Sequence, residues 1–196
     1  AKENTCENSV VIIGNAFDES NPEVKQAMSM PSVTTYWYHE FLGKLIEEYT
    51  SVSVAGTHGK TTTTGMVSHM MSLVAPTGYL IGDGTGEMPQ DSKYFIVESC
   101  EYKRHFLAYR PNYAILTNIE LDHVDYYKDL VDYCDAFEAF ANQVKKGIVM
   151  FGDDANVRSL KVTTKHLYYG LEEDNDVRAI NVIQNENGMS FDVIYQ

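Results

Sequence analysis

Residues 51–70, SVSVAGTHGKTTTTGMVSHM, decide the fold of this chain. The β-branched and small residues at 51–55 predict a buried strand, and residues 60–74 predict a helix. A turn with two glycines separates the two elements. Threonine is a weak helix former, so the four threonines that follow Lys60 need a reason other than helix propensity.

The turn resembles a shortened phosphate-binding loop. The general pattern is G-x-x-x-x-G-K-[ST], but Val54 stands where the first glycine is expected, and the chain reads G-x-x-G-K-T at 56–61. A strand leads in and a helix leads out, so free N–H groups and the helix dipole converge there. Lys60 suits the β- and γ-phosphate oxygens and Thr61 suits Mg²⁺. The plainer alternative is a strand–turn–helix corner with an exposed lysine.

Two further stretches place possible ligands after apolar runs. Glu98 ends the run YFIVES at 94–99, where a carboxylate would lie in the ligand crevice of an open α/β sheet. The stretch TNIELDHVDYY at 117–127 carries Asn118, Glu120, Asp122, His123 and Asp125. The alternatives are a solvated acid at Glu98, a structural histidine at His123, and a helix cap at Asp122 or Asp125. Convergence of three strand ends favours a site.

Alternation of strands and helices predicts an α/β fold, a P-loop-type, doubly wound and mostly parallel sheet with helices on both faces. The predicted strands are 9–14, 33–38, 51–55, 78–82, 94–99, 113–119 and 147–152, and the predicted helices are those opening at Pro22, 39–49, 60–74 and 130–144. The last residues predict two strands around an Asn-Gly turn. Residues 1–50 form a β-α-β-α unit too small for its own sheet, so we expect a fragment of a longer protein.

Composition narrows the class of protein. The formal charge of −13 over 196 residues argues against a general nucleic-acid binder, but not against binding one nucleotide. No apolar run is long enough for a membrane span, and the N-terminus lacks the apolar core of a secretory signal. Three widely spaced cysteines indicate reduced thiols rather than disulfides or a zinc site. We therefore expect a cytoplasmic protein.

The motifs GTHGKTTTT, VESCE and TNIELDHVDYY, in this order and spacing, resemble those of the Mur ligases, which build the peptide of bacterial peptidoglycan. The resemblance is strong through residues 51–140 and weak after about 150. The stretch VVIIGNAFDESNPEV resembles the end of the family's N-terminal domain. The resemblance implies that 1–50 are the C-terminal part of a Rossmann-like, UDP-sugar-binding domain. It implies that 51–196 are a truncated central ATP-binding domain, and that the C-terminal domain is absent.

The resemblance also implies a reaction and its residues. ATP phosphorylates a substrate carboxylate, and an amino acid's amine attacks the acyl phosphate. The residues implied to wrap the ATP phosphates are Gly56, Thr57, His58, Gly59, Lys60, Thr61 and Thr62. Thr61 and Glu98 would hold one Mg²⁺ and His123 a second, with Lys60 and His123 in catalytic roles. Asp83 would line the same cleft, and Tyr133 falls at a family position, though it suits a packed helix residue equally.

Details of the motifs bear on the choice within the family. His58 and the form TNIE-DH-D-Y are most similar to the members that join L-alanine to UDP-N-acetylmuramate. Sister ligases carry a carbamylated lysine on the following helix, whereas residues 129–144 hold no lysine and Phe137 stands near its place. The open alternatives are a ligase that recycles muramyl peptides, a P-loop ATPase or GTPase switch, and a module that binds UDP-sugar without turnover. We expect this polypeptide to be inactive alone, and its sequence leaves the oligomeric state undetermined.

Overall fold

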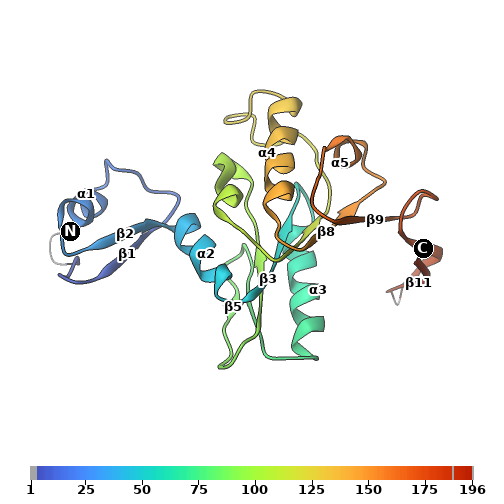
Figure 1. Cartoon of the computed structure of the whole chain (residues 1–196), viewed down its shortest axis with the longest axis horizontal. Helices are drawn as coiled ribbons and strands as arrows, with labels where there is room; N and C mark the ends of the chain where they lie inside the picture. The colour runs from blue at the N-terminus through green and yellow to red at the C-terminus, as the bar shows by residue number, and fades with distance from the viewer. Residues whose placement is uncertain (1–3, 187, 196) are drawn as a thin grey trace.

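The computed structural model describes residues 4–186 and 188–195. Two parallel strands and a helix lie at the N-terminal end, a large sheet forms the body, and an antiparallel hairpin ends the chain (Figure 1). The elements are β1 Val10–Ile13, α1 Pro22–Ser29, β2 Thr34–Trp37, α2 Tyr38–Glu47, β3 Thr50–Ala55, α3 Lys60–Ser72, β4 Thr77–Leu80, β5 Gly86–Glu87, β6 Tyr94–Glu98, the 3₁₀ segment η1 Tyr102–Ala108, β7 Tyr113–Leu116, α4 Leu130–Gln143, β8 Gly147–Phe151, α5 Ala155–Ser159, β9 His166–Gly170, β10 Val177–Asn185 and β11 Gly188–Tyr195.

The body is built on one mixed sheet. Among the described residues nine strands run in the order β11-β10-β9-β8-β7-β3-β6-β4-β5. Every neighbouring pair from β4 to β10 is parallel, and only the edge pairs β4–β5 and β10–β11 are antiparallel. Strand β3 lies inside the sheet, between β7 on one side and β6 on the other. The predicted α/β fold with a mostly parallel sheet is confirmed.

Helices cover both faces of the sheet. Side chains from α2, η1 and α4 join the inward residues of β6, β7 and β8 in the main apolar core, in which Phe106, Phe137 and Phe140 are fully buried. Helix α3 contacts β3, β4 and β6. It packs on the other face, because the buried Ile96 alternates along β6 with the core residues Phe95 and Val97. The core therefore fixes the central strands whose ends carry the candidate site.

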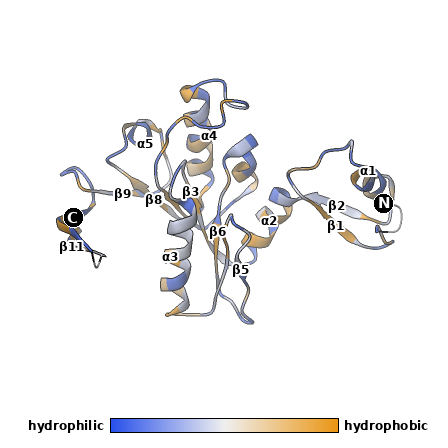
Figure 2. Cartoon of the chain, turned by 180° about the vertical axis from the view of Figure 1, so that it is seen from behind, coloured by the Kyte–Doolittle hydropathy of each residue, from blue (hydrophilic) through white to orange (hydrophobic). Residues whose placement is uncertain are grey.

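The N-terminal unit is a βαβ arrangement. Strands β1 and β2 pair in parallel, and α1 connects them. Asn21 accepts hydrogen bonds from the N–H groups of Glu23 and Val24, and Pro22 is the first residue of the helix, as the sequence predicts. In Figure 2 the hydrophobic colour marks β1, where Val10 and Ile12 are exposed. This unit lies apart from the large sheet, and α2 joins the two (Figure 1).

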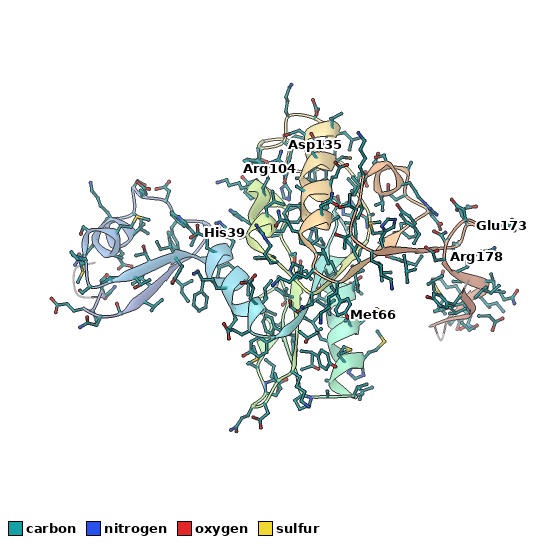
Figure 3. The ribbon with its side chains drawn as sticks, in the orientation of Figure 1. His39, Met66, Arg104, Asp135, Glu173 and Arg178 are labelled. Carbon is teal, nitrogen blue, oxygen red and sulfur yellow. The ribbon has the colours of Figure 1, made fainter. Side chains whose placement is uncertain are left out.

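A side-chain cluster ties the N-terminal unit to the body. The imidazole rings of His39 on α2 and His105 on η1 stack with centroids 4.3 Å apart. The Asn15 side chain, from the loop after β1, lies 2.9 Å from His39 Nδ1 and 3.2 Å from His105 Nδ1. Figure 3 shows His39 where α2 meets η1. Three segments that are distant in sequence therefore meet at one point.

Several boundaries differ from the sequence-based prediction. The strand predicted at 113–119 ends at Leu116, because Thr117 and Asn118 turn to bind the glycine-rich loop. The strand predicted at 78–82 is β4, Thr77–Leu80. Asp129, not Asp122 or Asp125, caps α4 by accepting a hydrogen bond from the Asp132 N–H. The final hairpin is present as β10 and β11, while Asn187 of its predicted turn lies outside the described residues.

Candidate functional site

The candidate site lies where the strand order reverses. Strands β6, β3 and β7 are parallel neighbours, and the chain passes from β6 to β7 across β3. In open α/β sheets such a switch point opens a crevice outside the carboxyl ends of the strands. The loop after β3, Glu98 at the end of β6 and the residues that follow β7 all emerge at this edge. The convergence predicted for three strand ends is therefore present.

Two glycines with positive φ values determine the backbone conformation of the loop. Gly56 has a φ of +136°, and a Cβ at this position would lie 2.0 Å from Thr117 Oγ1. Gly59 has a φ of +80° and precedes the first residue of α3. None of the described atoms would lie within 4 Å of a Cβ at Gly59. Gly56 is thus needed on the packed side of the loop, and Gly59 leaves the other side open.

The residues after β7 hold the loop in place. The Thr57 N–H donates to the Asn118 carbonyl (3.0 Å), and the Thr57 hydroxyl donates to the Glu120 carbonyl (2.9 Å) and lies 3.1 Å from the Tyr133 hydroxyl. The His58 N–H donates to Asn118 Oδ1 (2.9 Å). The N–H groups of Thr57 and His58 therefore face the protein, although sequence reasoning grouped both residues with the phosphate-binding loop.

The open donors belong to the first turn of α3. The first four N–H groups of a helix have no partner within the helix. Across residues 4–186 and 188–195, the loop and cap hydrogen bonds include none donated by the N–H groups of Gly59, Lys60, Thr61 or Thr62. These groups lie at the positive end of the helix dipole, on the side that Gly59 leaves open. The arrangement suits an anion such as a phosphate.

Lys60 is the first residue of α3, and its ammonium is turned inward. Lys60 Nζ donates to the carbonyl oxygens of Gly56 (2.6 Å) and Thr57 (3.0 Å) and to Glu101 Oε1 (3.2 Å). Glu101 Oε2 lies 3.0 Å from Nζ, as an ion pair rather than in hydrogen-bond geometry. The Lys60 side chain is only 14% exposed. The predicted phosphate-binding cation is thus beside the loop and already has anionic and carbonyl partners.

Thr61 and Glu98 come together as predicted for a metal site. The Thr61 hydroxyl donates to Glu98 Oε1 (3.3 Å), and Glu98 Oε2 accepts a hydrogen bond from the Gly82 N–H (2.8 Å). A hydroxyl and a carboxylate are oxygen ligands of the kind that Mg²⁺ prefers, usually with several waters and a phosphate. The donor set of Thr61 and Glu98 therefore fits Mg²⁺.

His123 contacts a different carboxylate. Its Nε2 lies 3.3 Å from Glu101 Oε1, and its ring centroid lies 4.8 Å from that of Tyr102. Within the part of the chain that the structure describes, no group of three or more His, Cys, Asp or Glu side chains is arranged to hold a metal. His123 as a ligand of a second Mg²⁺ therefore stays a prediction.

Glu101 was missed by sequence reasoning. It lies three positions after Glu98, it is 2% exposed, and it contacts both Lys60 and His123. Tyr133 also reaches it, donating from its hydroxyl to Glu101 Oε1 at 3.5 Å. The motif VESCE contains this second acid, but nothing in the sequence distinguishes a buried carboxylate from a solvated one.

Neighbouring groups are held in defined protonation states. Burial raises the pKa of the Tyr133 phenol above its ordinary value, so this hydroxyl is a proton donor across the neutral pH range. A hydrogen bond from the Tyr102 hydroxyl (2.7 Å) lowers the pKa of Asp125. Tyr133 is fully buried on α4, so it combines core packing with a contact to the loop.

A cleft of about 410 Å³ extends the site toward the N-terminal unit. Its lining includes Lys60 and Glu98 at one end and Asn15 and Tyr38 of the first fifty residues. Asp83, predicted to line this cleft, is not among its lining residues: its carboxylate accepts a hydrogen bond from the Thr85 N–H (2.8 Å) and so caps its own turn. A ligand larger than a phosphate would therefore contact both parts of the chain.

Comparison with known proteins identifies clear relatives. Residues 54–196 match the family described as Mur ligase middle domain. The chain is 52% identical over 195 residues to UDP-N-acetylmuramate–L-alanine ligase of Lactiplantibacillus plantarum, an alignment that covers 100% of the chain and 44% of that protein. The chain thus spans less than half the length of this curated relative.

Solved structures share the fold. The UDP-N-acetylmuramate:L-alanyl-gamma-D-glutamyl-meso-diaminopimelate ligase of Neisseria meningitidis is 26% identical with a TM-score of 0.80, over 95% of this chain and 64% of that one. The UDP-N-acetylmuramate-alanine ligase of Thermotoga maritima is 23% identical with a TM-score of 0.79, over 100% and 46% of the two chains. At that identity the second likeness concerns the fold alone. None of the described helices is both long and apolar enough to cross a bilayer.

Proposed function

The chain belongs to the Mur ligase family, and we propose that it forms the ATP- and magnesium-binding part of a ligase of peptidoglycan synthesis. The complete enzyme joins L-alanine to the carboxylate of UDP-N-acetylmuramate. The relative from Lactiplantibacillus plantarum, at 52% identity, carries this name and supports the choice of substrates. The observation that carries the proposal is the pairing of Thr61 with Glu98 beside the open N–H groups of α3.

The proposed reaction has two steps. A carboxylate oxygen of the sugar substrate attacks the γ-phosphorus of ATP, ADP leaves, and an acyl phosphate forms. The neutral amine of L-alanine then attacks the carbonyl carbon, phosphate leaves with the electron pair of the broken C–O bond, and the amide nitrogen loses a proton. Bound Mg²⁺ would supply charge neutralisation between the carboxylate and the γ-phosphate.

The residues of this chain contribute binding and charge. The N–H groups of Gly59 to Thr62 bind phosphate oxygens, and Lys60 neutralises the group that is transferred. Thr61 and Glu98 would hold the metal, and His123 faces the same edge. Thr57 and His58 act on the protein side of the loop, where they hold its shape. In-line phosphoryl transfer requires mainly such positioning and electrostatic stabilisation.

The two parts of the chain bind different substrates. We assign residues 1–50 to the UDP-sugar-binding domain and residues 51–196 to the central ATP-binding domain, with a further domain of the complete enzyme binding the amino acid. The cleft supports this division because it reaches from Lys60 to Asn15 and Tyr38. The free thiols of Cys6, Cys100 and Cys134 support a cytoplasmic location for the enzyme, and we expect the segment alone to be inactive.

The test is an amino-acid-dependent phosphate-release assay on the full-length enzyme that contains this chain. ATP, Mg²⁺, UDP-N-acetylmuramate and L-alanine are supplied together, and each is then omitted in turn. We expect phosphate release only with all four, and a loss of at least about 100-fold in Lys60→Ala because a charge at the transferred phosphate is removed. Release that persists in Lys60→Ala would contradict the loop assignment, and release without the sugar would favour an ATPase switch.

A second candidate is a ligase that recycles muramyl peptides. The likeness to the Neisseria meningitidis ligase, with a TM-score of 0.80 at 26% identity, favours considering it. The same assay separates the two when the tripeptide L-alanyl-γ-D-glutamyl-meso-diaminopimelate replaces L-alanine. We expect L-alanine to support the faster reaction, and a preference for the tripeptide would reverse the assignment.

A further inference from the structure

Glu101 is a buried carboxylate with an unusual set of partners. It is 2% exposed and follows β6 at the start of η1. A buried charge costs several kcal/mol unless ion pairs and hydrogen bonds compensate for the lost water. Lys60 supplies the ion pair at 3.0 Å, and His123 and Tyr133 approach the same carboxylate at 3.3 and 3.5 Å. Removing Lys60 from this group would leave a negative charge with weaker compensation.

The contacts of Lys60 account for all of its donors. A lysine ammonium has three N–H bonds. Lys60 Nζ directs them at the Gly56 carbonyl, the Thr57 carbonyl and Glu101. A phosphate at the open N–H groups of α3 can be bound by the ammonium only if one of these three contacts is given up. The two carbonyls belong to the loop itself, so Glu101 is the partner with which an anion competes directly.

The peptide around Glu101 is fixed independently of Lys60. The Tyr127 hydroxyl donates to the Glu101 carbonyl in a short contact, and Tyr127 is 2% exposed. His123 has a φ of +53°, which the N–H groups of Tyr126 and Tyr127 stabilise by donating to its carbonyl (2.8 and 2.9 Å). Tyr127 therefore links the Glu101 peptide to the turn at His123, so the carboxylate stays in place when the lysine moves.

We propose that Glu101 is a positioning residue that holds Lys60 in a retracted arrangement in the ligand-free protein. When nucleotide binds, the Lys60 ammonium leaves the Glu101 carboxylate and contacts a phosphate instead. The inference rests on the proposed function, in which Lys60 contacts the transferred phosphate. In the ligand-free protein the carboxylate neutralises the lysine and keeps it against the loop. In the bound protein His123 and Tyr133 remain as the partners of Glu101. Each binding event thus gives up one ion pair, and this loss lowers the affinity for the nucleotide.

The test is the affinity of the full-length protein for MgATP, measured by calorimetry with and without Glu101→Gln. The substitution keeps the shape of the side chain and removes the charge that competes for Lys60. We expect MgATP to bind roughly tenfold more tightly, the change that one charge-assisted hydrogen bond can make. We expect the KM for ATP to fall in the same variant, because the phosphate no longer has to displace a charged partner of Lys60. A variant damaged only in its structure would lose affinity and kcat together.

The matched control is Glu120→Gln, which removes an acid at the same edge of the sheet. The Glu120 side chain is 77% exposed and pairs at 3.3 Å with His58, whose side chain is 65% exposed. Its charge is screened by water, so we expect the affinity for MgATP to change less than about twofold. An equal rise in both variants would mean that the general negative field, not the contact with Lys60, limits binding, and would overturn the proposal.

The remaining outcomes are also decisive. An affinity of Glu101→Gln that is unchanged or weaker overturns the competition between carboxylate and phosphate. Should Glu101→Gln not fold, Glu101→Asp shortens the side chain by one methylene, and the same rise of smaller size is expected. Wild-type protein that binds no MgATP, or Lys60→Ala that binds it normally, would refute the proposed function itself. Normal wild-type binding that Lys60→Ala loses, without a rise in either Glu101 variant, would refute only the present inference.

Discussion

Gly82 controls the position of Glu98 although it has no side chain. Its N–H donates to Glu98 Oε2, and a Cβ at this position would lie 2.6 Å from Glu98 Oε1. This same Oε1 accepts a hydrogen bond from the Thr61 hydroxyl at 3.3 Å. One carboxylate is therefore held between a backbone N–H and a hydroxyl, with no room for a carbon atom beside it. The proposed metal ligand Glu98 thus has the backbone of a glycine as its outer partner.

Substitution Gly82→Ala is expected to displace Glu98 and weaken the proposed metal site. Loss of an outer partner typically lowers metal affinity by about 10- to 100-fold. We expect the Mg²⁺ concentration that half-saturates nucleotide binding to rise by about tenfold. The measurement is a Mg²⁺ titration of the binding of a fluorescent ATP analogue.

Gly65→Ala is the matched control for this change. A Cβ at Gly65, in the interior of α3, would make only an ordinary contact of 3.8 Å with Ile81 Cδ1. It should leave the Mg²⁺ requirement as it is and slightly stabilise the helix. If both variants required the same Mg²⁺ concentration as the wild type, Gly82 would have no influence on the metal.

Part of the site could be predicted from residue types alone. Lys60, Thr61, Glu98 and His123 stand next to recognisable strand ends, and the structure brings Thr61 to Glu98. Two features could not be predicted. Glu101 is distinguished only by its burial, and the N–H groups of Thr57 and His58 are turned to Asn118 by contacts that cross about sixty positions of sequence. A motif specifies which groups are present, whereas their direction depends on distant residues.

Helix α2 approaches η1 more closely than most side chains permit. A Cβ on Gly43 would lie 2.5 Å from the Ala108 carbonyl oxygen and 3.5 Å from the Tyr109 ring. The same helix places Leu42 and Ile46 in the main core. The glycine thus sets the distance between the helix that leads in from the N-terminal unit and the segment that follows Glu101.

Gly43→Ala is expected to destabilise the protein by about 1–3 kcal/mol, because the added methyl forces the two backbones apart. Alanine has the higher helix propensity, so this loss would run against the propensity scale. The check is chemical denaturation monitored by circular dichroism. A free energy of unfolding equal to or greater than that of the wild type would mean that the two backbones can separate without cost.

Helices and strands whose apolar residues recur at a regular spacing could be predicted from the sequence. Short or irregular elements could not. Helix α4 was predicted at 130–144 and spans Leu130–Gln143, since its apolar side chains recur at helical spacing. In η1, Lys103 and Arg104 have φ values of +51° and +59°, a conformation that no sequence period signals. Helix α5 and strand β9 have five residues each and were missed for the same reason.

The connection between the two parts of the chain contains titratable groups. His39 and His105 stack at 4.3 Å around Asn15. Burial, together with the nearby His39 and Lys103, lowers the pKa of His105 to about 4. Burial also lowers the pKa of His39, against a smaller opposing effect of Glu40. The folded protein therefore keeps both rings neutral at a pH where an exposed histidine would be charged. Contacts across 90 positions, such as Asn15 with His105, could not be predicted from local sequence.

This connection predicts a loss of stability in mild acid. Between pH 6.5 and about 4 the unfolded chain binds a proton at His105 that the folded chain does not. Stability is therefore full above pH 6.5 and declines as the pH falls toward 4. We expect the Tm advantage of the wild type over His105→Gln to shrink from pH 7.5 to pH 5. His69→Gln, at an exposed position of α3, serves as the control. A difference in Tm that is independent of pH would show that His105 does not titrate differently on folding.

The hydrogen bonds of Thr57 to residues after β7 have a consequence for folding during synthesis on the ribosome. Its hydroxyl partners, the Glu120 carbonyl and the Tyr133 hydroxyl, come 63 and 76 positions later in the chain. At about 5–20 residues per second, the ribosome adds Tyr133 roughly 4–15 s after Thr57. During that interval the glycine-rich loop has emerged without the groups that shape it. A nascent chain therefore completes the proposed nucleotide-binding loop late, once Tyr133 on α4 has left the exit tunnel and can contact Thr57.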